Sequence, residues 1–545
     1  MNRKLLNLSF VIAVLIGISN ASTVLARAEN LPPAIRITPP APQFSDAERQ
    51  AELQKRRQAV MAAMTKANPH SVMILFSAEP RLYTGDVDYV YRQENNFYYL
   101  TMLKKAGAKL VLMPGNTETP EVLFLPKRDS SRETWNGKMY SREEAQAVSG
   151  IKTVLDAEDF EPFVTALREG KAFEKLGKAN LRNVVAAQPA MLYLLQPVGG
   201  DNREWMQETA FAETWKNQPT FKIENAQFIF WDLRLVKSLF EQAMLQHAID
   251  ITTEAFGRSM ATAGRSKMEY EVQAEVEYTF RRRNADFWGY PSIVGCGPNA
   301  TTLHYEESQG AVKPGDLLLM DVGAEYEHYT ADVTRTFPVS GKFSKEQAEI
   351  YQIVYDAQEA IARTTKPGAN FSDVNNAAIE VLKDGLFRLG LITDKNSKQY
   401  RIWFMHGTSH WLGMNVHDVG ASNNRFKPGN VFTNEPGIYI RADALDYLPK
   451  TPENAKFIAA VHPAFEKYKN IGVRIEDDLL VTETGCQWLT RNLPRTIDGI
   501  ENMIARARQE LHSDENGFLS KPKAEKFFDE SSVSLNFKDI LNRRL

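Results

Sequence analysis

Five side chains that commonly bind metal ions follow one another along the C-terminal half of the 545-residue sequence: Asp321, Asp332, His410, Glu435 and Glu476. Each acid stands beside apolar or β-branched residues, where a buried charge needs a compensating partner. A single acid of this kind is more typical of a salt bridge or a turn. Because the pattern occurs four times and includes a histidine, it predicts a two-metal hydrolase site.

Four carboxylates and one imidazole form a hard, oxygen-rich ligand set that suits manganese, magnesium or calcium, with iron, cobalt and zinc tolerated. Two ions held about 3.5 to 4 Å apart can share a water, lower its pKa and stabilise the oxyanion that forms when the water attacks an amide. The expected nucleophile is therefore a hydroxide that bridges the ions. Glu435 is the candidate proton carrier between this water and the leaving nitrogen.

The elements that must hold these ligands are strands and long helices. Residues 317–338, which contain both aspartates, read as the two strands of a hairpin that Gly323 interrupts. Arg474 lies two residues before Glu476, so on a strand it would share that face and could orient a carboxylate. Apolar periodicity predicts helices at 238–262, 267–284, 344–364 and 372–389. Helices mixed with antiparallel strands indicate an α+β domain.

The sequence around the ligands resembles the Xaa-Pro aminopeptidases (aminopeptidases P) of the pita-bread metallopeptidase superfamily, which includes prolidase. The resemblance runs from about residue 47 to 491. It implies that Asp332 and Glu476 bridge both ions, that Asp321 completes the shell of one ion, and that His410 and Glu435 complete the other. It also implies a substrate-facing set of histidines that bind no metal: His304, His406 and His417.

This resemblance further implies two Mn²⁺ ions, a homo-dimer or homo-tetramer, and release of the N-terminal residue from peptides with proline in second position. Prolidase, which cleaves Xaa-Pro dipeptides, is the first alternative because it shares the five ligands. An exported binding protein with an inactive peptidase fold is the alternative from another class. Such proteins usually lose ligands, and all five positions are filled here.

The sequence is expected to divide into a smaller N-terminal α/β domain at 45–232, a catalytic domain at 233–491 and a C-terminal extension at 492–545. The resemblance implies that the catalytic domain has the pita-bread fold, with helices on a curved antiparallel sheet. The N-terminal domain is expected to have a helix at 45–66, strands at 71–76, 108–113 and 121–125, and helices at 142–148 and 159–169. The stretches 92–101 and 133–137 resemble the N-terminal domain of aminopeptidase P. In that family the tryptophan corresponding to Trp135 reaches the active site of a neighbouring subunit.

Residues 1–28 have the basic, apolar and small-residue regions of a secretory signal peptide, and a proline-rich spacer follows at 29–44. The apolar run at 5–18 is shorter than the about 20 residues that a membrane span needs. We therefore expect a periplasmic or secreted protein without a stable membrane span, and an uncleaved anchor is the alternative. The two cysteines, Cys296 and Cys486, could pair in such a compartment.

Three further expectations come from composition and spacing. The net charge of −3 gives no strong attraction to nucleic acid. Glu435 and Glu476 are 41 residues apart, and the excess over compact relatives lies at 441–470, which reads as a loop insertion at the edge of the site. Surface decoration or subunit packing is the alternative for this insertion. His328 and His462 are expected at the surface, and a helix is expected at 495–510.

Overall fold

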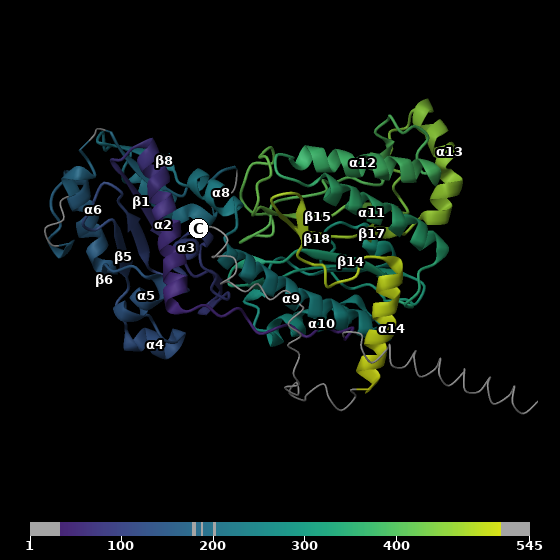
Figure 1. Cartoon of the computed structure of the whole chain (residues 1–545), viewed down its shortest axis with the longest axis horizontal. Coiled ribbons are helices and arrows are strands. Elements are labelled where there is room, and N and C mark those ends of the chain that lie inside the picture. Colours follow the sequence, from purple (N-terminus) through teal and green to yellow (C-terminus); the bar gives the residue numbers. More distant parts are fainter. Residues whose placement is uncertain (1–32, 177–180, 187–188, 200–202, 514–545) are drawn as a thin grey trace, which may run out of the picture.

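The computed structural model describes residues 33–176, 181–186, 189–199 and 203–513. The predicted signal peptide, the start of the spacer and the chain beyond residue 513 lie outside the described residues. Two bodies stand side by side along the long axis, with the N-terminal part in purple and blue and the C-terminal part in green and yellow (Figure 1). Within the described ranges, no helix has the length and apolar character needed to cross a membrane.

The N-terminal body is built on a mixed six-stranded sheet with the order β6-β5-β4-β1-β7-β8. Strands β1 and β5 have the predicted bounds, and every residue of β1 is buried. Its strands are β1 Ser71–Phe76, β4 Lys109–Leu112, β5 Glu121–Leu125, β6 Val154–Asp156, β7 Ala190–Leu194 and β8 Phe221–Asn225, and a separate hairpin consists of β2 Leu82–Thr84 and β3 Val87–Asp88.

Helices cover this sheet, and local signals fix where they begin. In α2, Ser45 accepts a hydrogen bond from the backbone of Glu48 while the Glu48 side chain accepts one from Ser45, a reciprocal cap that starts the helix as predicted. The predicted boundary between residues 232 and 233 falls inside α8 and stays a prediction. The helices are α2 Asp46–Ala67, α3 Asn95–Thr101, α4 Ser130–Asn136, α5 Arg142–Ser149, α6 Phe160–Glu169, α7 Met206–Glu213 and α8 Gln227–Leu235.

The long helices of the C-terminal body lie close to their predicted positions. Reciprocal caps at Ser238, Ser344 and Asn370 start α9, α11 and α12. The helices are α9 Leu239–Thr262, α10 Glu269–Arg282, α11 Lys345–Thr364, α12 Phe371–Arg388, α13 Pro452–Tyr468 and α14 Ile497–Ser513.

Short antiparallel strands fill the space between these helices, in the orders β10-β11-β14, β13-β12-β9, β15-β18-β19 and β16-β17. The predicted hairpin at 317–338 is present as β11 paired with β14, but the small β12–β13 turn is inserted between them. The strands are β9 Phe287–Trp288, β10 Ile293–Cys296, β11 Leu317–Val322, β12 Ala324–Tyr326, β13 Tyr329–Thr330, β14 Val333–Pro338, β15 Val431–Asn434, β16 Gly437–Tyr439, β17 Gly472–Arg474, β18 Asp477–Val481 and β19 Cys486–Trp488.

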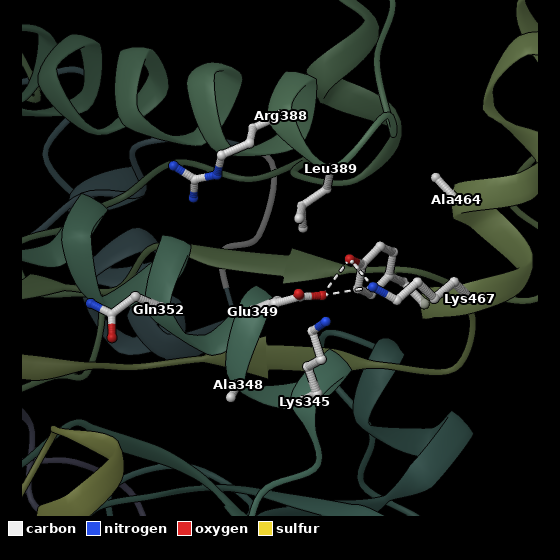
Figure 2. Close-up of a pocket in the computed structure, with 9 residues that line it drawn as sticks. Lys345, Ala348, Glu349, Gln352, Arg388, Leu389, Ala464 and Lys467 are labelled. Carbon is white, nitrogen blue, oxygen red and sulfur yellow. Dashed lines mark hydrogen bonds and ion pairs between the residues drawn. The ribbon is translucent and has the colours of Figure 1, made fainter.

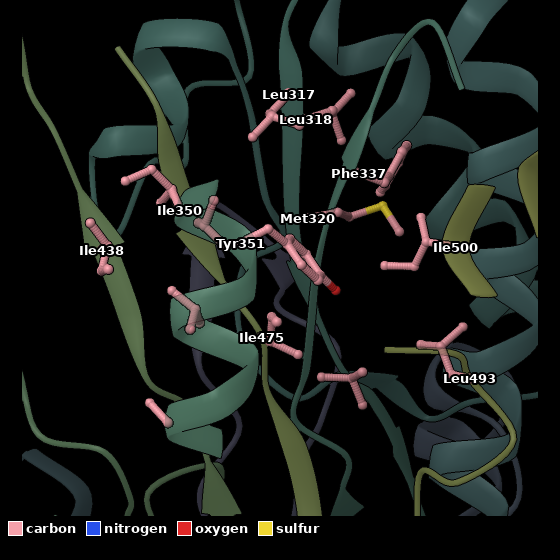
Figure 3. Close-up of a cluster of buried hydrophobic side chains, with 14 of the residues drawn as sticks. Leu317, Leu318, Met320, Phe337, Ile350, Tyr351, Ile438, Ile475, Leu493 and Ile500 are labelled. Atoms are coloured by element: carbon pink, nitrogen blue, oxygen red, sulfur yellow. The ribbon is translucent and has the colours of Figure 1, made fainter. Parts of the chain in front are cut away.

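A continuous apolar core joins strands and helices of this body. In Figure 3, Tyr351 of α11 lies beside Met320 of β11, and Ile475 and Ile500 approach from later parts of the chain. Helices α9 and α10 pack on the first strands, and α11 packs on β15, β16 and β17. The predicted α+β architecture is thus confirmed, with helices covering antiparallel strands. Cys296 and Cys486 are both free thiols in the structure.

The prediction of a loop at 441–470 is wrong, because this segment contains the 17-residue helix α13. Thr451 caps it, Pro452 occupies its first turn, and Phe457, Val461 and Phe465 are buried at four-residue spacing. The helix packs against α11 at the end of the molecule away from the N-terminal body (Figure 1).

A pocket of about 730 Å³ lies between α11, α12 and α13 (Figure 2). Its walls combine charged side chains with apolar ones such as Leu389 and Ala464, and Lys467 contacts Glu349 at 2.9 Å. Among the described residues that line it, none belongs to the predicted site.

Candidate metal centre

Backbone pairing brings the five predicted ligands into one cleft of about 380 Å³. Asp321 lies near the end of β11, and Asp332 immediately precedes β14. Thr334 of β14 forms an antiparallel bridge with Glu476, with N–O distances of 3.0 and 3.3 Å. The backbone of Thr433 in β15 donates to the carbonyl of His410. Glu435 follows β15 directly, so the two halves of the strand system place acids on both sides of the cleft.

The ligand atoms of Asp332, His410 and Glu476 all lie within 4.8 Å of one another. His410 Nε2 is 3.3 Å from Asp332 Oδ2 and 3.5 Å from Glu435 Oε1. Asp332 and Glu476 are only 4% and 2% exposed. Three nitrogen and oxygen donors thus converge at a spacing that one cation could span, with Glu435 adjacent.

Tyr290, which the sequence reasoning missed, joins the two aspartates. Its hydroxyl lies 2.6 Å from Asp321 Oδ1 and 2.7 Å from Asp332 Oδ1, so its single proton can serve either oxygen. The residue stands in the connection between β9 and β10, and no feature of the local sequence marks it. It holds the two carboxylates side by side.

Arg474 contacts Asp321 more closely than it contacts Glu476. Its Nη2 donates to Asp321 Oδ2 at 2.5 Å, whereas its Nε is 3.9 Å from Glu476 Oε2. Its Nη1 donates to the hydroxyl of Tyr439 at 2.9 Å, and that hydroxyl is 2.8 Å from His406 Nε2. Tyr439 was also missed, although it follows Glu435 by only four residues.

The carboxylates carry more negative charge than the protein itself balances. Burial and the charges of the neighbouring acids raise the pKa of Glu476 well above its usual range. Burial raises the pKa of Glu435 to about 7, despite the nearby charge of His410. In the described part of the chain, Arg474 is the one guanidinium within 4 Å of these carboxylates. A divalent cation would supply the missing positive charge, so the residues present fit a metal.

The histidines of the cleft differ in environment. Burial opposes charge on His410, but its contacts with Asp332 and Glu435 raise its pKa to about 9. Burial and the charge of Arg474 lower the pKa of His406 to about 3, so this ring stays neutral, and its Nδ1 donates to the carbonyl of Gly407. The ring of His417 lies 4.4 Å from that of His410. His304 is exposed on the wall of the same cleft.

Two other residues singled out from the sequence lie elsewhere. Trp135 is 84% exposed on α4, in the N-terminal body, and is not among the described residues that line this cleft. The prediction that His328 is at the surface is wrong, because its side chain is only 4% exposed and stacks on Tyr98. His462 is exposed on α13, as expected.

Comparison with known families gives two adjacent matches along the chain. The sequence model of the aminopeptidase P N-terminal domain matches residues 53–174. The model of metallopeptidase family M24 matches residues 243–483, a range that contains all five predicted ligands.

Individual relatives match over most of their length. Xaa-Pro aminopeptidase of Escherichia coli is 33% identical over 479 residues, which cover 86% of this chain and 100% of the relative. Human Xaa-Pro aminopeptidase 3 is 30% identical and is covered to 86%. Among solved structures, Pseudomonas aeruginosa aminopeptidase PepP has a TM-score of 0.71 at 32% identity, covering 84% of this chain and 99% of that one. E. coli aminopeptidase P in complex with substrate also has a TM-score of 0.71, at 30% identity over 86% of this chain and 100% of that one.

Proposed function

The chain belongs to the Xaa-Pro aminopeptidase family of metallopeptidases, and from this membership we propose that it releases the N-terminal residue from peptides with proline in second position. One observation carries the proposal: the five predicted ligands converge in a single cleft, together with His304, His406 and His417. The complete ligand set favours an enzyme over a binding protein with an inactive peptidase fold.

Two divalent ions, with Mn²⁺ as the first candidate, fit the oxygen-rich ligand set. Asp332 and Glu476 would bridge them. Asp321, held by Arg474 and Tyr290, would complete one shell, and His410 with Glu435 would complete the other. When bound, such ions lower the pKa of a water molecule and polarise the scissile carbonyl group.

The protein's own groups then move the proton and orient the peptide. Glu435 takes a proton from the attacking water and delivers it to the leaving proline nitrogen. His417 donates a hydrogen bond to the substrate carbonyl or its tetrahedral intermediate, and His304 contributes from the cleft wall. Neutral His406, whose one N–H is donated to Gly407, orients the hydroxyl of Tyr439 through Nε2. Apolar side chains in the same cleft offer a surface for the proline ring: Pro291, Ile293, Leu303 and Val416.

A peptide panel tests this proposal. Purified protein with added Mn²⁺ should cleave Xaa-Pro-Yaa after the first residue, leave Xaa-Ala-Yaa intact, and lose activity in chelator. Cleavage confined to the Xaa-Pro dipeptide would support prolidase instead. Stable metal binding without hydrolysis of any peptide would favour the binding-protein alternative. Metal analysis of the same sample, with about two equivalents expected, tests the two-ion assignment.

We further propose a homo-dimer or homo-tetramer in which Trp135 contributes to a neighbouring subunit's cleft. Its 84% exposure, and an exposed apolar hairpin formed by Leu82, Tyr83, Val87 and Tyr89, support a subunit contact on this body. Light scattering of wild type and Trp135→Ala, together with their KM values, tests the idea. The signal-like residues 1–28 support export, which N-terminal sequencing of the mature protein would check.

A further inference from the structure

Two segments of the catalytic body, each located between residues of the candidate metal centre, touch the start of α3 in the N-terminal body. The first is the ligand turn, residues 325–330, which joins the strand of Asp321 to Asp332. The second is the histidine loop, residues 413–417, which runs from just beyond His410 to His417. The backbone N–H of Thr330 donates to the carbonyl of Gly413 at 2.9 Å, so the two segments are also tied to each other.

Arg92 holds both segments with one guanidinium. Its Nε and Nη2 form a fork on the Glu325 carboxylate, with distances of 3.0 and 2.8 Å to Oε2. The same Nη2 donates to the carbonyl of Met414 at 3.0 Å. The Glu325 side chain is 5% exposed and that of Arg92 is 39% exposed, so the carboxylate of this charge-assisted fork is buried while solvent reaches the arginine side chain.

The side-chain amide of Asn95 also contacts both the histidine loop and the ligand turn. Its Nδ2 donates to Asn415 Oδ1 at 2.8 Å and approaches the Met414 carbonyl at 3.3 Å, both in the histidine loop. Its Oδ1 accepts from His328 Nδ1 in the ligand turn at 2.9 Å. Because an amide oxygen only accepts, this contact fixes the proton of His328 on Nδ1. Asn95 and His328 are each 4% exposed.

A second set of hydrogen bonds holds the C-terminal end of the histidine loop. Asn96 accepts from Arg234 Nη1 at 2.8 Å, and Arg234 Nη2 donates to Asp418, the residue after His417, at 2.5 Å. Both charged side chains are at most 2% exposed. The loop that presents His417 is therefore fixed from the N-terminal body at both ends.

We propose that Arg92 and Asn95 are positioning residues of the peptidase reaction, which set the ligand turn and the histidine loop in register across the interface between the two bodies. Neither residue lines the metal cleft, so each acts through the segments it holds. Displacing a reacting group by about 1 Å can lower a rate about a hundredfold, which makes such remote contacts consequential. The predicted effect on peptidase activity rests on the proposed function, whereas the predicted effect on metal binding does not.

The test compares Asn95→Ala, Asn95→Asp and Arg92→Lys with the control Glu52→Gln. The control removes the charge of Glu52, which accepts a hydrogen bond across the interface from Ser238 Oγ at 2.7 Å and one within α2 from Arg56 at 3.0 Å. For each variant we would measure kcat and KM on an Xaa-Pro-Yaa peptide, Mn²⁺ affinity by calorimetry, and the thermal midpoint of unfolding.

Asn95→Ala should lower kcat about tenfold or more with KM changed less than about twofold, and should weaken Mn²⁺ binding, because both segments lose their anchor. Asn95→Asp keeps the acceptor for His328 but loses the donor to the histidine loop, so kcat should fall while Mn²⁺ affinity stays near wild type. Arg92→Lys keeps the charge without the fork and should lie between wild type and Asn95→Ala. Glu52→Gln should lower only the unfolding midpoint.

Wild-type kcat and Mn²⁺ affinity in folded Asn95→Ala, with only the unfolding midpoint reduced, would overturn the proposal. If Asn95→Ala does not fold, Asn95→Asp and Arg92→Lys decide the same question. A wild-type protein that cleaves no peptide would refute the proposed function, and the calorimetric comparison would still test the hold on the ligand turn.

Discussion

Glu254 and Glu476 are both buried glutamates of the catalytic body, but their surroundings are opposite. Glu254, on α9, accepts hydrogen bonds from Arg283 at 2.6 and 2.7 Å, from Arg258, and from Thr38. Burial alone would raise its pKa, yet these donors lower it to about 2. For Glu476, burial and the charges of three neighbouring carboxylates raise the pKa well above its usual range, although Arg474 lies 3.9 Å away.

The difference shows that burial alone does not distinguish a structural acid from a functional one. The negative charge of Glu254 is neutralised by arginines of the same chain, so this residue needs no bound cation. The cluster around Glu476 contains four acids against the charges of Arg474 and His410, so in the described chain ionisation of all four acids leaves an excess of negative charge that bound cations would offset.

The largest expected effect comes from removing a ligand in the second of these environments. Asp332→Asn should lower kcat/KM at least about a thousandfold, since the carboxylate that would bridge two cations is lost. The metal-free variant should unfold at or above the wild-type temperature, because repulsion among the acids is relieved. Peptide assays and thermal scans measure both effects. Asp443→Asn, at the surface of the insertion, is the matched control.

Glu254→Gln should lower stability and leave activity nearly unchanged, the opposite of Asp332→Asn. The substitution removes the negative charge that Arg258 and Arg283 share, and should cost about 3 kcal/mol of unfolding free energy. Activity and metal affinity of the folded variant should stay within about twofold of wild type. Urea unfolding gives the first quantity. A large loss of Mn²⁺ affinity in this variant would contradict the separation of the two environments.

The pH dependence of stability should differ in sign between the two environments. The pKa of Glu435 is raised from 4.5 to about 7, so its stabilisation of the metal-free protein is present below pH 4.5 and lost as pH rises to 7. The pKa of Glu254 is lowered from 4.5 to about 2, so its stabilisation is present above pH 4.5 and lost as pH falls to 2.

Thermal unfolding of the metal-free protein at a series of pH values measures both effects: the loss of stability between pH 4.5 and 7, and the loss of stability between pH 4.5 and 2. Glu435→Gln should make the unfolding temperature less dependent on pH between 4.5 and 7. Glu254→Gln should make it less dependent on pH below 4.5. Saturating Mn²⁺ should reverse the loss near neutral pH, because bound cations keep the carboxylates ionised. An unchanged profile in Glu435→Gln would count against this account.

The smallest effect is expected in the larger pocket between α11, α12 and α13. Glu349 accepts hydrogen bonds there from Lys467 and Tyr468, at 2.9 and 2.5 Å. Because solvent reaches these groups, Glu349→Gln should shift the unfolding midpoint by less than about 3 °C and leave peptidase activity unchanged. A clear loss of activity would give this pocket a role that its composition does not suggest.

The fold class and most long elements could be predicted because their signals are local. Caps such as Ser238 with Glu241, and apolar periodicity, mark helices within a few residues. The candidate ligands were visible for a similar reason, since each acid interrupts an apolar strand. Their convergence in one cleft agrees with the prediction, while their individual roles stay predictions.

The features that were missed depend on contacts far along the chain. His328 has polar neighbours in sequence and is buried only because α3, with its acceptor Asn95 233 residues earlier, covers it. Tyr290 and Tyr439 became visible only when strand pairing placed their hydroxyls among the acids. The helix α13 is different, because its cap and its four-residue apolar spacing are local signals that lie in a segment whose prolines and charged residues favour a loop.

The contacts of Arg92 with the ligand turn and the histidine loop also bear on the order in which the two bodies fold during synthesis. During synthesis Arg92 precedes Glu325 by 233 residues and Met414 by 322. The last strand of the N-terminal sheet, β8, ends at Asn225, 92 residues before β11 begins at Leu317. At about 5 to 20 residues per second, this interval lasts roughly 5 to 18 s. The N-terminal domain therefore has time to fold before the metal-binding strands leave the ribosome, and those strands meet a surface that already exists.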